Sequence, residues 1–301
     1  MKKVINRFSC VSLIFLIAGN GLFVSGLQAG EEVDRSLIAE SNGTVRIINT
    51  RGEVVIRGWN KDEIRVEGEL DALAEELIFD VDGPQARIEV RLPRSNINWG
   101  DGSDLEIHVP QGSSIIFEGV STDITVKNIL GGLRLRSVSG DVFIERVEKL
   151  LMVKAVSGDI EVVQSSGKAN ISTVSGEIEV ELSSVDITLD TVSGEIDAEL
   201  EQFLNLRAIT VSGDIEIEGQ LMDGGEVDIS AVSGDVRLSL RPPVNASLDI
   251  ETGPGGSIEN NLSDHEPIDK FPAHMELEAQ LGDGSGDIRL RTISGDIRIE
   301  G

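Results

Sequence analysis

An eighteen-residue unit repeats in the middle of the chain and decides the fold. Residues 173–190 read TVSGEIEVELSSVDITLD, and residues 191–200 begin the same unit again as TVSGEIDAEL. Each copy is marked by Ser-Gly followed by Asp or Glu. The glycines of these turns occupy positions 140, 158, 176, 194, 213, 234, 286 and 295, and the first three intervals are eighteen residues each. A regular period of this length is typical of a solenoid.

Each unit contains two strand patterns that the turn connects. After the turn, Ile178, Val180 and Leu182 alternate with glutamates, which predicts a half-buried strand. Before the turn, the alternation of residues 187–190 predicts another strand. Glycine accepts positive φ, so we expect Gly176 and its equivalents to bend the chain. We expect the preceding valines to pack, and the acids that follow to stay in solvent.

A two-strand unit cannot bury its own apolar face, so the units are expected to stack on one another. We therefore predict an all-β fold, a parallel β-solenoid with about 18-residue coils and strands about 4.8 Å apart. A β-sandwich is the alternative, but the near-constant period favours the solenoid. Identical positions should form an aliphatic ladder of Val142, Ile160, Ile178, Ile196, Ile215, Val236 and Ile297.

The first 29 residues have the pattern of a secretory signal peptide. Lys2, Lys3 and Arg7 precede a largely apolar run over 11–24, and cleavage is expected near Ala29. Retention as an anchor is the alternative, although the run is short beside the roughly 20 residues of a spanning helix. We predict an exported protein, periplasmic or at the cell surface, without an integral membrane segment after signal removal.

Residues 30–301 are expected to form one β-solenoid domain with irregular capping ends. Only 71–77 has the pattern of a short helix, and five of the eight prolines fall within 242–272. The expected parts are a less regular 30–118, regular repeats over 119–241, a loop-rich insertion over 242–275 with one strand at 247–251, and C-terminal coils over 276–301.

Charge and cysteine content exclude several classes of partner and chemistry. Cys10 is the only cysteine and lies within the signal, so the exported chain has neither a disulfide nor a thiol. The signal contains three of the 26 Lys and Arg and no acid, so the rest has a net charge of 23 − 53 = −30. Such a surface repels nucleic acid and anionic lipid. A protein or another cell-envelope component is the expected partner.

Stacking should gather the acids that follow the turns into columns on one outward face. Like charges about 4.8 Å apart repel by roughly 0.9 kcal/mol in water, so the columns should attract cations. Calcium is the candidate ion, because hard cations prefer carboxylate oxygens. The weak metal-ligand candidates are Asp159, Glu177, Glu195 and Asp214 in the columns, and Asp283 and Asp287 in a Gly-Ser loop. The alternative is a solvated face that blocks aggregation.

No residue pattern singles out a catalytic or cofactor-binding site. The acids are too many and too repetitive to define an acid–base pair. His108, His265 and His274 lack the spacing of metal ligands. A carbohydrate-active β-helix enzyme would need one acidic pair to leave the columns near Trp59 or Trp99.

Several motifs in order resemble a bacterial family of β-strand-repeat domains of unknown function, labelled "putative adhesin". They are residues 45–47 (VRI), 50–54 (TRGEV), 58–59 (GW) with Asp62, 92–94 (LPR), 105–110 (LEIHVP) and the Val-Ser-Gly-Asp turns. The resemblance covers the whole chain after the signal. It implies a right-handed β-solenoid on the cell envelope, with some members linked to envelope-stress signalling and with no established catalytic residues.

Three hypotheses on function follow. The favoured one is a non-catalytic, exported envelope scaffold or adhesin-like binding module that uses its acidic face. The alternative is a divalent-cation-dependent adhesive or self-assembling protein. A further alternative is a carbohydrate-active β-helix enzyme. The pattern predicts no particular oligomeric state.

Overall fold

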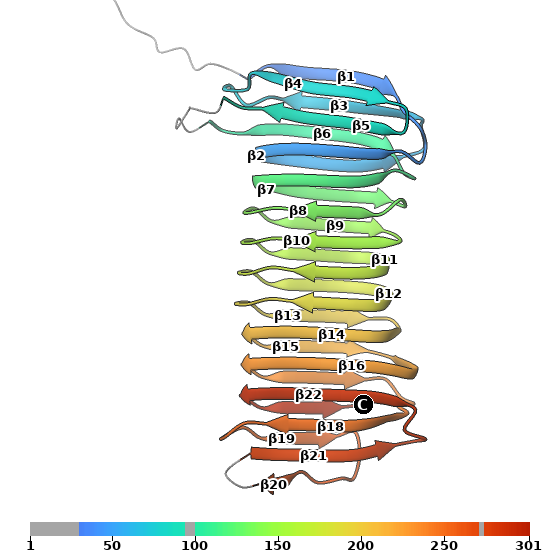
Figure 1. Cartoon of the computed structure of the whole chain (residues 1–301), viewed down its shortest axis with the longest axis vertical. Coiled ribbons are helices and arrows are strands. Elements are labelled where there is room, and N and C mark those ends of the chain that lie inside the picture. The colour runs from blue at the N-terminus through green and yellow to red at the C-terminus, as the bar shows by residue number, and fades with distance from the viewer. Residues whose placement is uncertain (1–29, 94–99, 271–273) are drawn as a thin grey trace, which may run out of the picture.

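The computed structural model describes residues 30–93, 100–270 and 274–301. The expected signal peptide and Trp99 lie outside these residues. The described chain is all-β and forms one elongated stack of strands (Figure 1). This confirms the fold class that the repeats predict, whereas the hand of the coil stays a prediction.

Coils of two strands build the middle of the stack. The strands are β7 (Ser114–Ile129), β8 (Leu133–Arg136), β9 (Val142–Val147), β10 (Leu150–Lys154), β11 (Ile160–Ser172), β12 (Ile178–Asp190), β13 (Ile196–Leu200), β14 (Phe203–Ser212), β15 (Ile215–Gly219), β16 (Leu221–Ser233) and β17 (Val236–Leu240). Strand parts before the turns pair in parallel with one another, and so do the parts after the turns. The coil therefore has two faces, and long strands such as β11 and β12 contribute to both.

The core lies between the two faces and consists of aliphatic ladders. The register pairs Val142 through Ile297 in the order that the repeat predicts, and all seven side chains are buried. A second ladder on the other face runs from Leu135 through Val153 and Ile171. Full burial of one such side chain stabilises a fold by about 1.5–3 kcal/mol, so stacking is the main source of stability.

Strands with mixed pairing cap the N-terminal end. They are β1 (Glu32–Ile38), β2 (Thr44–Trp59), β3 (Glu63–Glu69), β4 (Glu76–Asp82), β5 (Gln85–Arg91) and β6 (Ser103–Pro110), and β2 pairs only in parallel. β3 pairs antiparallel with β1 and β6, and β4 pairs antiparallel with β5. β2 comes first in the chain but lies between β7 on one side and β5 and β6 on the other. The stack order therefore departs from the chain order here.

The prediction of a short helix over 71–77 is wrong. Residues 71–75 form a turn, and β4 starts at Glu76. The Asp71 carboxylate accepts a hydrogen bond from the Leu73 backbone N–H at 2.8 Å and pairs with Arg51. Local bonding of this kind competes with helix formation.

The C-terminal end also departs from the chain order. Its strands are β18 (Ala246–Thr252), β19 (Ile258–Asn261), β20 (Ile268–Lys270), β21 (His274–Leu281), β22 (Gly286–Ser294) and β23 (Ile297–Glu300). β22 lies between β16 and β18, and β23 lies between β17 and β19. The chain thus builds its outermost coil before it returns to fill the gap. β21 pairs antiparallel with β18 and covers that end (Figure 1).

The segment 242–275 differs from the expected loop with one strand. It contains β18, β19, β20 and the start of β21, and it forms the outermost coil of the stack. The chain over 276–301 is likewise not only regular coil, because β21 runs antiparallel. Prolines and glycines mark the connections, but the strands between them pair with distant segments.

The repeated turn forms one corner of the coil. Gly176 has φ of +141°, and a Cβ built on it would overlap the carbonyl oxygen of Gly158 in the neighbouring coil. The expected packing of the preceding valine is wrong. Thr173 occupies the inward position and is buried, so Val174 beside it points into solvent.

Candidate functional site

Carboxylates cover one face of the central coils, as the repeat predicts. We call this set the acidic face, and all of its side chains are exposed: Asp159, Glu161, Glu177, Glu179, Glu181, Glu195, Asp197, Glu199, Asp214, Glu216 and Glu218. The strand register places them in three columns. Glu161, Glu179 and Asp197 form part of the middle column, while Glu181 and Glu199 belong to the outer one. Neighbours in a column are therefore about 4.8 Å apart along the stack.

Few cations compensate the acidic face. Among the described residues, Glu216 is its only member in an ion pair, with Arg237 at 3.0 Å. Desolvation raises the pKa of Glu177, and the like charges of Glu195 and Asp159 raise it further. The pKa of Asp197 is raised in the same way, by desolvation first and then by Glu216 and other neighbouring acids. The face therefore carries unrelieved repulsion that a cationic partner would reduce.

Aspartates at the corner have a structural role that the sequence did not reveal. The Asp159 backbone N–H donates to the Asp141 carboxylate at 3.0 Å, and the Glu177 N–H donates to the Asp159 carboxylate at 2.9 Å. Asp214 accepts in the same way from the Asp235 N–H at 2.8 Å. Each bond links two neighbouring coils. Two of the predicted metal ligands, Asp159 and Asp214, therefore already accept a hydrogen bond from the backbone.

Glutamate at the same corner position behaves differently. Within the described chain, neither Glu177 nor Glu195 accepts a hydrogen bond from the backbone N–H of the next coil, because the longer side chain carries the carboxylate away from it. The two glutamates are thus the corner acids whose carboxylates are free for another ligand. The difference depends on one methylene group, so an Asp/Glu pattern could have suggested it.

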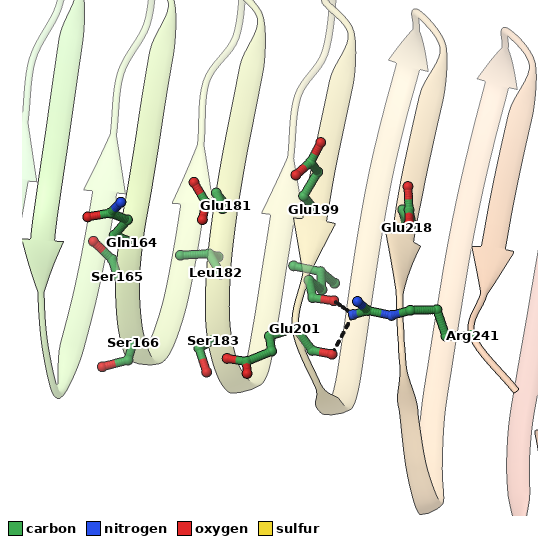
Figure 2. A pocket seen from close by; sticks show the side chains of 11 residues that line it. Gln164, Ser165, Ser166, Glu181, Leu182, Ser183, Glu199, Glu201, Glu218 and Arg241 are labelled. Atoms are coloured by element: carbon green, nitrogen blue, oxygen red, sulfur yellow. Dashed lines mark hydrogen bonds between the residues drawn. The ribbon is translucent and has the colours of Figure 1, made fainter. Parts of the chain in front are cut away.

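An open groove of about 480 Å³ lies at the end of the acidic face away from the turns. Figure 2 shows Glu181, Glu199 and Glu218 on successive strands along it. Arg241 is the only basic side chain that lines the groove, and its Nη2 donates to the carbonyls of Leu200 and Glu201 at 2.7 and 2.6 Å. The groove thus extends the acidic surface into a concave region. Its other lining residues are Gln164, Ser165, Ser166, Leu182 and Ser183.

The Gly-Ser loop candidates lie apart from the acidic face and have local partners. Asp283 accepts a hydrogen bond from the Ser285 N–H at 3.0 Å, and Asp287 pairs with Arg289 at 2.6 Å. Across residues 30–93, 100–270 and 274–301, no group of three or more His, Cys, Asp or Glu side chains has the arrangement of a metal site. Calcium binding stays a prediction.

The aromatic position considered for an enzyme is packed against its neighbours. The Trp59 ring lies 4.9 Å from the His108 ring, and its indole N–H donates to the Glu63 carbonyl at 2.8 Å. Glu106, whose carboxylate lies 3.6 Å from the His108 ring nitrogen Nε2, pairs with Arg57 at 2.8 Å. Trp59 is thus held by local contacts, whereas Trp99 lies outside the described residues.

The opposite face carries charges of both signs. Arg207 pairs with Asp228, and Arg291 pairs with Asp249 at 3.3 Å. Arg136 and Lys154 are register neighbours on β8 and β10, and neither of them forms an ion pair within the described residues. The two faces of the coil therefore differ in charge.

A family model described as Toastrack DUF4097 matches residues 42–225, which is more than half of the chain. This chain belongs to the Toastrack DUF4097 family. The match includes β2 through β15, and so contains the N-terminal cap without β1, together with the acidic face. It confirms the resemblance seen in the sequence motifs.

Two solved structures resemble this Toastrack chain at 13% identity each. One is described as a "putative adhesin" from Bacteroides fragilis, and the alignment covers 89% of this chain and 97% of that one with a TM-score of 0.42. The other is described as a "putative cell adhesion protein" from Clostridium sporogenes. The alignment covers 90% of this chain and 99% of that one, with a TM-score of 0.22. No curated protein matches the chain. Among the described residues, no helix reaches the length and apolarity that a membrane crossing requires.

Proposed function

We propose that this protein is an exported, non-catalytic binding module of the cell envelope, and that it holds a cationic partner on its acidic face. The register of the acidic face carries the proposal: eleven exposed carboxylates lie on four neighbouring coils, and only Glu216 has an ion-pair partner among the described residues. The basic, apolar pattern of residues 1–29 supports export. The two solved structures named for adhesion agree with a binding role.

The shape of the face favours an extended partner. The columns follow the stack, so carboxylates repeat about every 4.8 Å along it. A basic segment with cations at similar spacing could face several carboxylates at once, while the groove beside Glu199 would accept a longer side chain. Each exposed pair contributes about 0.2–1 kcal/mol, so affinity would depend on many pairs together and would fall with salt.

The repetition of the acids supports a non-catalytic role. Acid–base catalysis needs one group whose pKa differs from that of its neighbours. Glu177 and Asp197 have raised pKa values, but desolvation and the same repeated like charges raise both. Neither is set apart by a local partner. The site therefore suits charge recognition better than proton transfer.

The test is a binding titration with an oligolysine peptide at several salt concentrations. A variant with Glu161→Gln, Glu179→Gln, Asp197→Asn and Glu199→Gln should bind at least about tenfold more weakly, since four pairs of average strength would be lost. The matched control removes the same charge from exposed, unpaired acids elsewhere, through Glu31→Gln, Glu32→Gln, Glu40→Gln and Glu266→Gln. Equal loss in both variants would mean that net charge, and not the acidic face, governs binding.

A further inference from the structure

A row of exposed aliphatic side chains runs along the corner that the turns form. We call it the valine ridge, and it consists of Val120, Val138, Val156, Val174, Val192, Val211, Val232 and Ile293. The valines are 44–48% exposed and Ile293 is 61% exposed. Each coil contributes one member, and serine bridges, backbone hydrogen bonds or strand pairs join the neighbouring coils at this corner. The ridge is thus continuous along eight coils.

The ridge is unusual against the rest of the surface. Eight of the thirteen exposed large hydrophobic side chains of the described residues belong to it, and the other five are Leu37, Ile38, Val185, Met222 and Ile268. Single exposed apolar residues need no explanation, whereas a contiguous apolar row marks an interaction surface. About half of each valine is covered, and the outer half is open to a partner.

We propose that the valine ridge is the interface between two copies of this chain that lie side by side and parallel. A second copy carries the same ridge with the same spacing, so every aliphatic side chain can meet its own counterpart across a two-fold axis along the ridge. The charges on the two flanks of the ridge favour this arrangement over the antiparallel one.

One flank of the ridge is entirely acidic. Three residues after each ridge member lies an acid: Asp123, Asp141, Asp159, Glu177, Glu195, Asp214, Asp235 and Asp296. The other flank, two residues before each member, is mixed: Glu118, Arg136, Lys154, Ser172, Asp190, Ile209, Ser230 and Arg291. A parallel two-fold places the acidic flank of one copy beside the mixed flank of the other. An antiparallel two-fold would place eight acids beside eight acids.

Two cations on the mixed flank are available for the second copy. Arg136 and Lys154 lie in register on neighbouring strands and have no ion pair among the described residues. Glu118 is the acid beside Arg136 in the register, but Arg46 already binds it at 2.9 Å through both carboxylate oxygens. In the parallel arrangement, Arg136 and Lys154 would face Asp141 and Asp159 of the second copy.

The size of the ridge explains why the flanks decide the orientation. Seven steps of about 4.8 Å make it about 34 Å long. A stable dimer buries about 800 Å² on each copy, so the contact would have to be about 24 Å wide. That width exceeds a single row of valines, and the charged flanks must therefore lie within the interface.

The first test measures the mass of the protein, purified after export, by light scattering over a range of concentrations. We expect a dimer, and Val156→Asp with Val174→Asp should convert it to a monomer. Val185→Asp is the matched control, because Val185 is 51% exposed but lies off the ridge, and it should leave the dimer intact. A milder pair, Val156→Thr with Val174→Thr, keeps the branched shape and should weaken the dimer if the aspartates disturb folding.

The second test determines the orientation by disulfide formation in a Cys10→Ser background, which has no other thiol. Val138→Cys should cross-link to itself across a parallel dimer. In an antiparallel dimer, Val138 would lie opposite Val232, and only a mixture of Val138→Cys and Val232→Cys would cross-link. A monomer at all concentrations, a dimer that tolerates the ridge aspartates, or cross-linking of the mixture alone would overturn the proposal.

Discussion

The carboxylate of Asp159 accepts a hydrogen bond from the backbone N–H of Glu177, one coil further along, at 2.9 Å. The bond joins two coils outside the apolar core, and it recurs where the acid after the turn is aspartate, as at Asp141 and Asp214. Glu177 itself makes no such bond to the next coil, so aspartate and glutamate can be compared at the same corner position within one chain. Aspartate at the corner links two coils by a hydrogen bond, whereas glutamate contributes only its charge.

We predict different effects of alanine substitution on stability at these two neighbouring corners. Asp159→Ala should lower the free energy of unfolding by about 1 kcal/mol, the usual net contribution of a partly exposed hydrogen bond. Glu177→Ala should leave stability unchanged or raise it slightly, because it removes a repulsive charge and no hydrogen bond. Denaturant titration of both variants checks this. Equal destabilisation would show that the hydrogen bond contributes nothing beyond the charge.

We expect the corner glycine to tolerate no side chain, because of its backbone conformation and a close contact and not because of its burial. Gly176→Ala should destabilise the fold by about 3 kcal/mol, because the residue has positive φ and its new Cβ would overlap the Gly158 carbonyl. Gly224 also has positive φ, but no atom lies within 4 Å of its Cβ position. Gly224→Ala should therefore cost only about 1 kcal/mol of strain. Thermal melting of the two variants separates steric overlap from strain.

Stability should rise as the solution is made mildly acidic. Desolvation and like charges raise the pKa of Glu177 and Asp197 in the folded state. An acid with a raised folded pKa binds its proton more tightly when folded, so the stability it contributes is lost as pH rises through that pKa. We expect the melting temperature to increase as pH falls from 7 towards the ordinary carboxylate range, about 4.

Further acidification should reverse this gain. Burial is the largest single effect on Asp71 and raises its pKa, but Arg51 and the Leu73 N–H together outweigh it and hold that pKa below its usual value, and Lys127 lowers the pKa of Glu145. Protonation of these groups removes stability at lower pH. A variant with Glu177→Gln and Asp197→Asn should lose the rise near neutrality but keep the fall in acid. A melting temperature that decreases steadily from pH 7 in the unchanged protein would contradict the prediction.

Calcium should stabilise the protein through the acidic face. Millimolar Ca²⁺ would screen neighbouring carboxylates and should raise the melting temperature more than NaCl at equal ionic strength does, since hard divalent cations prefer carboxylate oxygens. The variant neutralised at Glu161, Glu179, Asp197 and Glu199 should lose most of this difference. If calcium and NaCl act alike, the acidic face has no preference for divalent ions.

Much of the fold was predictable because the repeat is local and periodic. Alternation assigns Ile178 to the core and Glu179 to solvent, and the constant period stacks Ile160, Ile178 and Ile196 in one ladder. The position of the acidic face follows from the same two facts. None of these assignments depends on how distant parts of the chain meet.

Other features depended on tertiary contacts. Val174 points outward because Thr173 takes the inward place at the corner, and alternation through a bend does not predict which of two neighbours turns in. The bond between Asp159 and Glu177 requires the distance between two coils, which spacing along the chain does not supply. The sequence therefore located the acids, but only the structure distinguished those that bind backbone from those that remain free.

By itself, the sequence determined the solenoid, its coil length and the two contrasting faces, because an eighteen-residue period with strict alternation leaves each strand one way to bury its apolar side. Only the tertiary structure decided the order at the ends. β22 enters between β16 and β18, and β2 lies between β6 and β7, because any free strand edge can accept any strand of matching register. Distant segments compete to pair with each free edge, and the packing of the whole stack determines which segment pairs there.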